Sequence, residues 1–409
     1  MIKKFFSKHY SLHFFIFILL YNFVVTRGFE LWTIDSGTYT YYLVDFSMGF
    51  CSKFLPGAIY NFFFDDTSTT AVSIFAIFLF LLCAALISIM LEKILKNADE
   101  KNKNLLLFLF VFLLTGPSLL PMCIYRIGSH DVFWILFFLL SILFLSNKRL
   151  YILIVPMCML SVTVNYGSLV SFIPAILLMM IYKITLIQEK KEKKWLWFTT
   201  ILSLLSAVLL SAYFMIFEHS NLTYTFEEFT AILNERGYVG EPYYFGSNLY
   251  DIEYYEEINY EHLESIQSPF IYAIAHVYYR VVWNFAYISM ETIIAPLLLS
   301  LPVIILIFSF LKTRIKDKEE KKLKRFVVFC MLAMFFFILL GGVFLSTDIV
   351  RFWGHAYTLL FAFFLYIVYN EKNDNLQHMS DCIAKIPKPV VALYFMCYLF
   401  MVFDPTGQV

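Results

Sequence analysis

The chain has 409 residues, of which 60% are hydrophobic and 15% are charged, and its mean hydropathy is +0.73. Soluble domains are about 45–50% apolar, so this composition excludes an ordinary soluble protein. The zero net charge gives no indication of a nucleic-acid partner, and the seven scattered cysteines include no CxxC pair that would indicate a zinc site or a disulfide framework.

Apolar segments recur along the whole chain, and roughly 20 apolar residues suffice for a helix to cross a bilayer. The pattern predicts an all-α, polytopic membrane protein with about 11 spans (10–12) in one integral membrane domain over residues 1–409. The first apolar segment lacks a small-residue cleavage site, so we expect it to be retained. The expected spans are 11–27, 68–91, 105–125, 132–147, 150–165, 167–185, 195–217, 288–311, 326–346, 354–370 and 390–404.

The first outer loop, residues 28–67, contains Asp35 and, ten residues later, Asp45. Its segment MGFCSKFLPGAIYNFFF is too short and too interrupted by Pro and Gly to span a membrane. Its aromatic side chains favour a position among the lipid headgroups. We therefore expect interfacial helices in this loop.

The second outer turn reads YRIGSHDVFW and brings Arg126, His130 and Asp131 together in the sequence. The simplest structural role for this turn is at the start of the fourth span. Ser129 would then cap the helix, and the Asp131 carboxylate would complement the helix dipole.

The long outer loop, 218–287, carries eleven acidic residues between positions 218 and 268, against the single base Arg236, and is rich in aromatic residues. His276 and Arg280 follow, four residues apart, which places them on one face if this segment is helical. The last outer turn, FLSTDIVRFWGHAY, gives Asp348, Arg351 and His355 the i, i+3, i+7 spacing of a helical stripe. The simplest structural role there is an Asp348–Arg351 ion pair.

The positive charges predict the orientation of the chain. The expected inner segments hold 25 of the 31 Lys and Arg residues, and the outer segments hold six. Cytoplasmic loops are enriched in Lys and Arg, so this split predicts a cytoplasmic N-terminus and an outside C-terminus in the plasma or inner membrane. No phosphate-binding Gly-rich motif occurs, which argues against an ATP-driven pump within this chain.

The unusual polar residues therefore gather at the predicted outer face. Carboxylates can serve as general bases or hold a divalent cation such as Mg²⁺ or Mn²⁺, although the sequence indicates no certain cofactor or set of metal ligands. Arginines suit a phosphate or pyrophosphate group. Aromatic loops can stack on sugars, and an apolar groove can take a lipid tail. These are the needs of an enzyme that uses a polyprenyl-linked sugar.

The order of a first span, a long outer loop with Asp35 near its start, and paired spans with short turns resembles membrane glycosyltransferases of the GT-C type. The resemblance implies a polyprenyl-phosphate-sugar donor and a catalytic acid in the first outer loop, for which Asp35 is the best match. DFSMGFCSKFLPGAIYNFF and STDIVRFWGHAY also look like segments of membrane proteins from bacterial surface-polysaccharide clusters.

The leading hypothesis is an outer-leaflet glycosyltransferase that assembles a surface polysaccharide or glycolipid, with a lipid-linked sugar, a glycan acceptor and membrane lipid as partners. Alternatives are a Wzy-type repeat-unit polymerase for O-antigen or capsule, and a flippase for lipid-linked oligosaccharides. The candidate catalytic residues are Asp35, Asp45, His130 and Asp131; the candidate phosphate ligands are Arg126, Arg280 and Arg351; the candidate supporting residues are His276, Asp348 and His355.

Overall fold

The computed structural model describes residues 9–22, 24, 34, 36–116, 120, 123, 127–217, 221–238, 294–318, 320–345, 349–371 and 375–399. Apart from an isolated backbone bridge between Gly49 and Leu222, the regular structure of these residues is helical. The elements are α2 (Tyr10–Tyr21), α3 (Ser36–Leu43), η2 (Phe46–Met48), α4 (Leu55–Phe63), α5 (Thr69–Asn97), α6 (Glu100–Thr115), α8 (Asp131–Leu145), η3 (Tyr151–Leu153), α9 (Ile154–Val164), η4 (Tyr166–Val170), α10 (Phe172–Leu186), α11 (Lys190–Phe217), α12 (Phe226–Glu235), α16 (Ala295–Lys316), α17 (Lys322–Leu345), α18 (Ile349–Asn370), α19 (Asn375–Ala384) and α20 (Lys388–Leu399).

Five helices of the described chain, α5, α11, α16, α17 and α18, are long and apolar enough to cross a membrane. The other six expected spans also coincide with helices, but these have only 11 to 16 residues. The all-helical architecture is therefore confirmed for the described residues, and five of their helices could cross a membrane, whereas the number of 11 spans stays a prediction.

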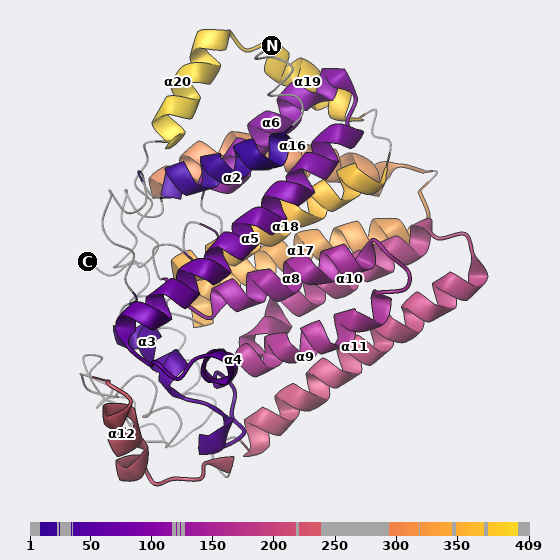
Figure 1. Ribbon diagram of the computed structural model, residues 1–409. Helices are drawn as coiled ribbons and strands as arrows, with labels where there is room; N and C mark the ends of the chain where they lie inside the picture. The colour runs from indigo at the N-terminus through magenta and orange to yellow at the C-terminus, as the bar shows by residue number, and fades with distance from the viewer. Residues whose placement is uncertain are drawn as a thin grey trace, which may run out of the picture.

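The long helices lie side by side (Figure 1), with α18 packed on α17, α5 on α2, and α9 between α8 and α11. Their contacts are mainly aromatic and aliphatic, as in the edge-on packing of Phe310 against Phe364 and of Phe14 against Phe110. Small hydroxyl side chains within the helices form hydrogen bonds with backbone carbonyl groups of the preceding helical turn. Ser88 and Ser141 each donate to the carbonyl four residues earlier, which satisfies the hydroxyls without water.

The predicted inner segments contact one another at one end of the helices. The Ser11 backbone N–H donates to Glu92 Oε2 at 3.0 Å, and Tyr151 Oη donates to Glu192 Oε1 at 2.8 Å. The predicted outer segments meet at the opposite end, where Tyr42 Oη donates to the Gly128 carbonyl at 2.9 Å. The alternation of the charge pattern therefore corresponds to two physical ends of the molecule.

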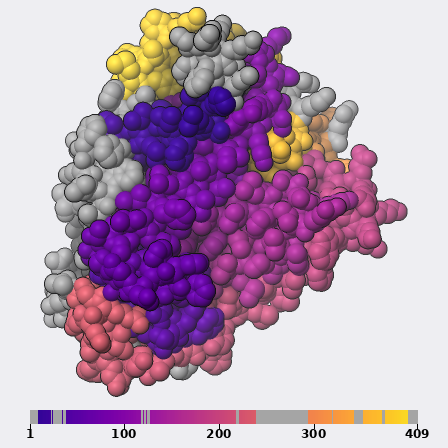
Figure 2. Space-filling model, viewed as in Figure 1, coloured from indigo at the N-terminus to yellow at the C-terminus, as the bar shows by residue number. Residues whose placement is uncertain are grey.

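The first outer loop folds into α3, η2 and α4 and packs against α12 at the lower left of the molecule (Figure 2). The loop contains two short helices, α3 and α4, and their interfacial position stays a prediction. The Thr223 backbone N–H donates to the Met48 carbonyl at 3.0 Å. Gly49 has φ +139°, and a Cβ there would lie 2.4 Å from the Asn221 carbonyl oxygen, so the approach of the two loops requires glycine.

Candidate functional site

An ionic cluster lies where α8 and α18 begin at the predicted outer end. Asp131, the first residue of α8, is 1% exposed. Its Oδ1 atom accepts hydrogen bonds from Arg351 Nε at 3.1 Å and Nη2 at 2.9 Å, and lies 3.2 Å from His355 Nε2. These three contacts all use one carboxylate oxygen.

Arg351 and His355 reach Asp131 from the first two turns of α18. Residues four apart lie on the same face of a helix, which is why both side chains meet the same carboxylate. The Arg351 side chain is 16% exposed and that of His355 is 4% exposed. The partner that the structure gives Arg351 is thus Asp131, 220 residues away, while Asp348 lies outside the described residues.

Trp134 packs against the cationic and imidazole groups of the cluster. Its ring lies 5.5 Å from the Arg351 guanidinium carbon, 5.1 Å from the His130 ring and 5.5 Å from the His355 ring. Trp134 Nε1 donates to the Ser161 carbonyl at 2.9 Å, which fixes the indole. A guanidinium over an indole face is a favourable cation–π arrangement. Trp134 was not among the residues predicted from the sequence, although its place one turn after His130 was a usable signal.

His130 is buried and its Nε2 atom is hydrogen-bonded to Arg351 Nη2. Because a guanidinium can only donate, Nε2 accepts and the ring proton sits on Nδ1. Burial, followed by the positive charge of Arg351, holds the pKa of His130 well below its usual value, which keeps the ring neutral. Nδ1 itself is buried and has no hydrogen-bond partner among the described residues.

The expected capping role of Ser129 is wrong. The N-cap residue of α8 is His130, with helical φ and ψ of −61° and −15°, and no side chain caps the helix. Ser129 Oγ is instead buried and has no hydrogen-bond partner among the described residues. Two adjacent residues, of which His130 contacts Arg351, thus have buried polar atoms without hydrogen-bond partners among the described residues, and a ligand or water would satisfy them.

Asp45 lies in a different arrangement, which joins the first outer loop to α12. Its Oδ2 atom accepts from Arg236 Nη1 at 2.9 Å and Asn61 Nδ2 at 2.9 Å, and its Oδ1 accepts from the Ser47 backbone N–H at 2.8 Å. Burial alone would raise the pKa of Asp45, but the hydrogen bonds from Ser47 and Asn61 and the charge of Arg236 lower it. We call this the loop clasp.

The loop clasp makes Asp45 a weak candidate for a general base, because its charge is already stabilised. It also explains Arg236, which the sequence analysis noted only as the single base of an acidic segment. Arg236 Nη1 additionally donates to the Leu43 carbonyl at 2.5 Å, so it holds both the backbone and the carboxylate of the first loop.

The remaining predicted site residues lie outside the described residues. These are Asp35, Arg126, His276, Arg280 and Asp348. Most of the long outer loop, from 239 to 287, lies outside them as well. The structure therefore brings together His130, Asp131, Arg351 and His355 from the predicted set, and leaves the other assignments as predictions.

Neither of the described candidate carboxylates, Asp45 or Asp131, is free for a divalent cation, and the possible cation stays a prediction. Asp45 and Asp131 are each bound to an arginine, and a dication would compete for the same oxygen atoms. Within the described chain, no group of three or more His, Cys, Asp or Glu residues could hold a metal ion.

The comparisons with known proteins add no relative. No family model, no curated protein and no solved structure matches the chain. The function must therefore be argued from the cluster of His130, Asp131, Arg351 and His355, which we call the outer cluster.

Proposed function

We propose that this protein is a membrane glycosyltransferase that acts at the outer leaflet on a polyprenyl-phosphate-linked sugar, in the assembly of a surface polysaccharide or glycolipid. One observation supports this proposal most strongly. The partly buried guanidinium of Arg351, at the predicted outer end, contacts His130. The buried atoms Ser129 Oγ and His130 Nδ1 lack hydrogen-bond partners among the described residues. A ligand with several oxygen atoms and a negative charge would satisfy all of them.

In this proposal Arg351 binds the phosphate of the donor. A guanidinium has five N–H donors in a planar fork, so it can hold a carboxylate and a phosphate at the same time. Asp131 positions the guanidinium, and Trp134 supports its flat face. The Nδ1–H group of His130 and the Ser129 hydroxyl would donate to other oxygens of the donor.

Release of the sugar from a polyprenyl phosphate transfers the bonding electrons to the phosphate oxygen. Positive charge and hydrogen-bond donors at that oxygen stabilise the leaving group, and such preorganised donors contribute strongly to catalysis. We assign this task to Arg351. We assign the general base, which takes the proton from the hydroxyl of the glycan acceptor, to Asp35, as the resemblance to GT-C enzymes implies.

Reconstitution of the full chain in proteoliposomes with a panel of polyprenyl-phosphate sugars tests the proposal. A glycosyltransferase releases free polyprenyl phosphate as the sugar moves to its acceptor. A repeat-unit polymerase would instead lengthen a lipid-linked glycan, and a flippase would move the lipid across the bilayer without cleaving it. Either of these outcomes would contradict the proposal.

The variant R351K examines the role of the guanidinium in the same assay. We expect turnover to fall by about 100-fold or more, because an ammonium group cannot replace the planar fork. R149K provides the matched control, since Arg149 is an exposed residue of the turn after α8. Equal losses in both variants would show that the guanidinium of Arg351 has no special part in turnover.

A further inference from the structure

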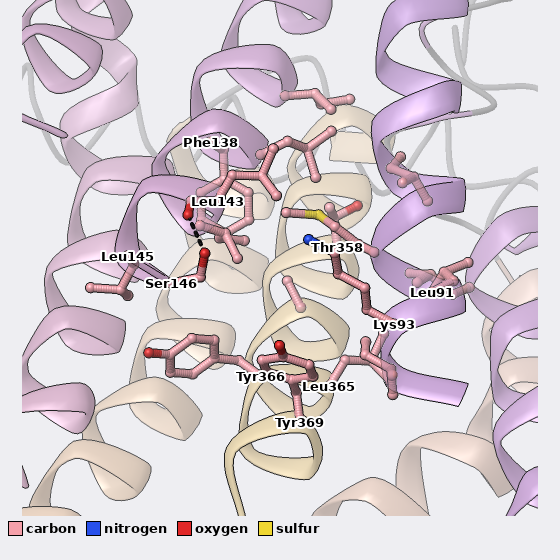
Figure 3. A pocket seen from close by; sticks show the side chains of 18 of the residues that line it. Leu91, Lys93, Phe138, Leu143, Leu145, Ser146, Thr358, Leu365, Tyr366 and Tyr369 are labelled. Carbon is pink, nitrogen blue, oxygen red and sulfur yellow. Dashed lines mark hydrogen bonds between the residues drawn. The ribbon is translucent and has the colours of Figure 1, made fainter. Parts of the chain in front are cut away.

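An apolar groove of about 280 Å³ runs along the helices from near the outer cluster to the opposite end. Figure 3 shows Leu91 and Lys93 of α5 on one wall, Phe138, Leu143 and Ser146 of α8 on the opposite wall, and α18 between them. The groove begins near Ile135 and Thr358, about one helical turn from Asp131 and His355. It extends along α8 and α18 to Ser146 and Asn370.

The chemistry of the groove changes along its length. Apolar side chains such as Ile135, Leu139 and Leu365 line its body. Lys93, Lys183 and Asn370 line the end that belongs to the predicted cytoplasmic side, and none of the lining residues is acidic. The groove thus combines a hydrocarbon surface with a positively charged end.

Neither lysine is neutralised by a carboxylate in a hydrogen-bonded pair. Lys93 is exposed and makes no hydrogen bond or ion pair with a residue that the structure describes. Lys183 Nζ donates at 3.4 Å to Asn370 Oδ1, which belongs to a neutral amide, and Glu192 lies close enough to interact with its charge without a hydrogen bond between them. In addition, Tyr366 lines the groove and its buried Oη has no hydrogen-bond partner in the described part of the chain.

We propose that this groove binds one anionic phospholipid of the cytoplasmic leaflet. The phosphate group would lie at Lys93 and Lys183, and one acyl chain would lie between α5, α8 and α18. Basic pockets between membrane helices on the cytoplasmic side suit anionic headgroups, and the apolar body of the groove matches an acyl chain. The proposal goes beyond the proposed glycosyltransferase activity and does not depend on it.

Native mass spectrometry of the detergent-purified full chain tests this site. The protein is titrated with phosphatidylglycerol and, separately, with phosphatidylcholine of identical acyl chains. We expect one tightly bound phosphatidylglycerol and much weaker phosphatidylcholine. In the double variant K93Q/K183Q, phosphatidylglycerol binding should weaken by about 30-fold, since each lysine near an anionic lipid contributes about 1 kcal/mol.

Three further variants make the result specific to the groove. K96Q/K190Q removes the same number of charges from α5 and α11 outside the groove and should leave binding unchanged. A362F places a ring in the apolar body and should abolish the tight site, whereas L209F, on an exposed face of α11, should not. Unfolding of each variant is measured in parallel.

Three results would overturn the proposal. Equal binding of the two phospholipids would show that the headgroup charge is not recognised. Unchanged binding in K93Q/K183Q, or an equal loss in K96Q/K190Q, would place the lipid elsewhere. Tight binding of a polyprenyl phosphate with no tight phosphatidylglycerol would assign the groove to a different lipid class.

Discussion

Two buried ionic clusters lie at opposite ends of α18. Comparing their composition indicates which one stabilises the fold and which one is a candidate functional site. The inner cluster joins Arg314 of α16, Glu320 and Lys324 near the start of α17, and Glu371 just after α18. The outer cluster lies at the start of α18, where Arg351 pairs with Asp131. The 20 residues between Arg351 and Glu371 correspond to about 30 Å along a helix.

The inner cluster is balanced in charge. Glu320 and Glu371 each contact both Arg314 and Lys324, and Tyr182 Oη donates to Glu371 as well. Four helices are tied together by this network. Its two acidic and two basic side chains neutralise one another, which is why we interpret the network as structural.

The outer cluster has a different composition. It contains one carboxylate, one guanidinium and two imidazoles, and Ser129 Oγ and His130 Nδ1 are buried without partners among the described residues. Ionisable groups within a membrane domain are costly to bury and are by default candidates for function. Incomplete satisfaction of polar groups does not by itself distinguish the two clusters, because Glu320 Oε2 of the inner cluster is also buried without a hydrogen bond from a described residue. The outer cluster is distinguished by its two imidazoles and by its predicted outer position.

The largest expected effect comes from breaking the outer pair. D131A leaves the Arg351 guanidinium without its carboxylate in a buried place, and removal of one partner of such a pair destabilises a protein by about 3–5 kcal/mol. Thermal unfolding in detergent measures the change. D131L/R351M removes both charges and should recover much of the loss; a loss of less than 1 kcal/mol in D131A would contradict the buried pairing.

Removal of one charge from the inner cluster should lower the stability by less than D131A does. E371Q keeps the shape of the side chain but removes a charge that Arg314 and Lys324 share, and hydrogen bonds to charged groups contribute about 1.5–3 kcal/mol. We expect a stability loss of about 2 kcal/mol in the same unfolding assay. E100Q, in the exposed pair with Lys103, should change stability by at most about 0.5 kcal/mol. Similar losses in both variants would contradict the structural role of the network.

The smallest effect concerns the loop clasp and its dependence on pH. The pKa of Asp45 is lower in the folded protein than in an unfolded chain, so the unfolded state binds more protons as the medium becomes acidic. The clasp therefore contributes to stability at pH values above the ordinary pKa of an aspartate. This contribution is lost as the pH falls through the lowered pKa of Asp45.

Hydrogen exchange of the α12 amides measures this clasp. The ordinary pKa of aspartate is about 4. As the pH falls below this value and through the lowered pKa of Asp45, we expect the exchange of the α12 amides, corrected for the intrinsic rate, to rise toward the level seen in D45N. D65N is the matched control, since Asp65 is an exposed carboxylate outside the clasp. An α12 exchange profile in D45N identical to that of the unmodified protein would refute the clasp.

The sequence predicted the helices well because long apolar segments have few other solutions in a membrane. Each expected span coincides with a helix, and Arg351 and His355 share a face as their spacing indicated. The pairing of Arg351 with Asp131 was not predictable, because spacing along one helix says nothing about residues 220 positions away. The pairing of Asp45 with Arg236 was not predictable for the same reason. Glu320 and Glu371 lie within or beside segments whose charges were interpreted only as determinants of orientation, so their pairing with Arg314 was not predicted either.

The most direct test compares R351K with R314K, the same substitution in the outer and the inner cluster. Turnover of a polyprenyl-phosphate sugar in proteoliposomes is measured per folded molecule, with the folded fraction taken from size-exclusion chromatography. We predict that R351K keeps its folded fraction and loses about 100-fold or more in turnover, while R314K loses folded protein and keeps turnover per folded molecule. Unchanged turnover in R351K, or equal losses in the two variants, would contradict the assignment of the outer cluster as the functional site.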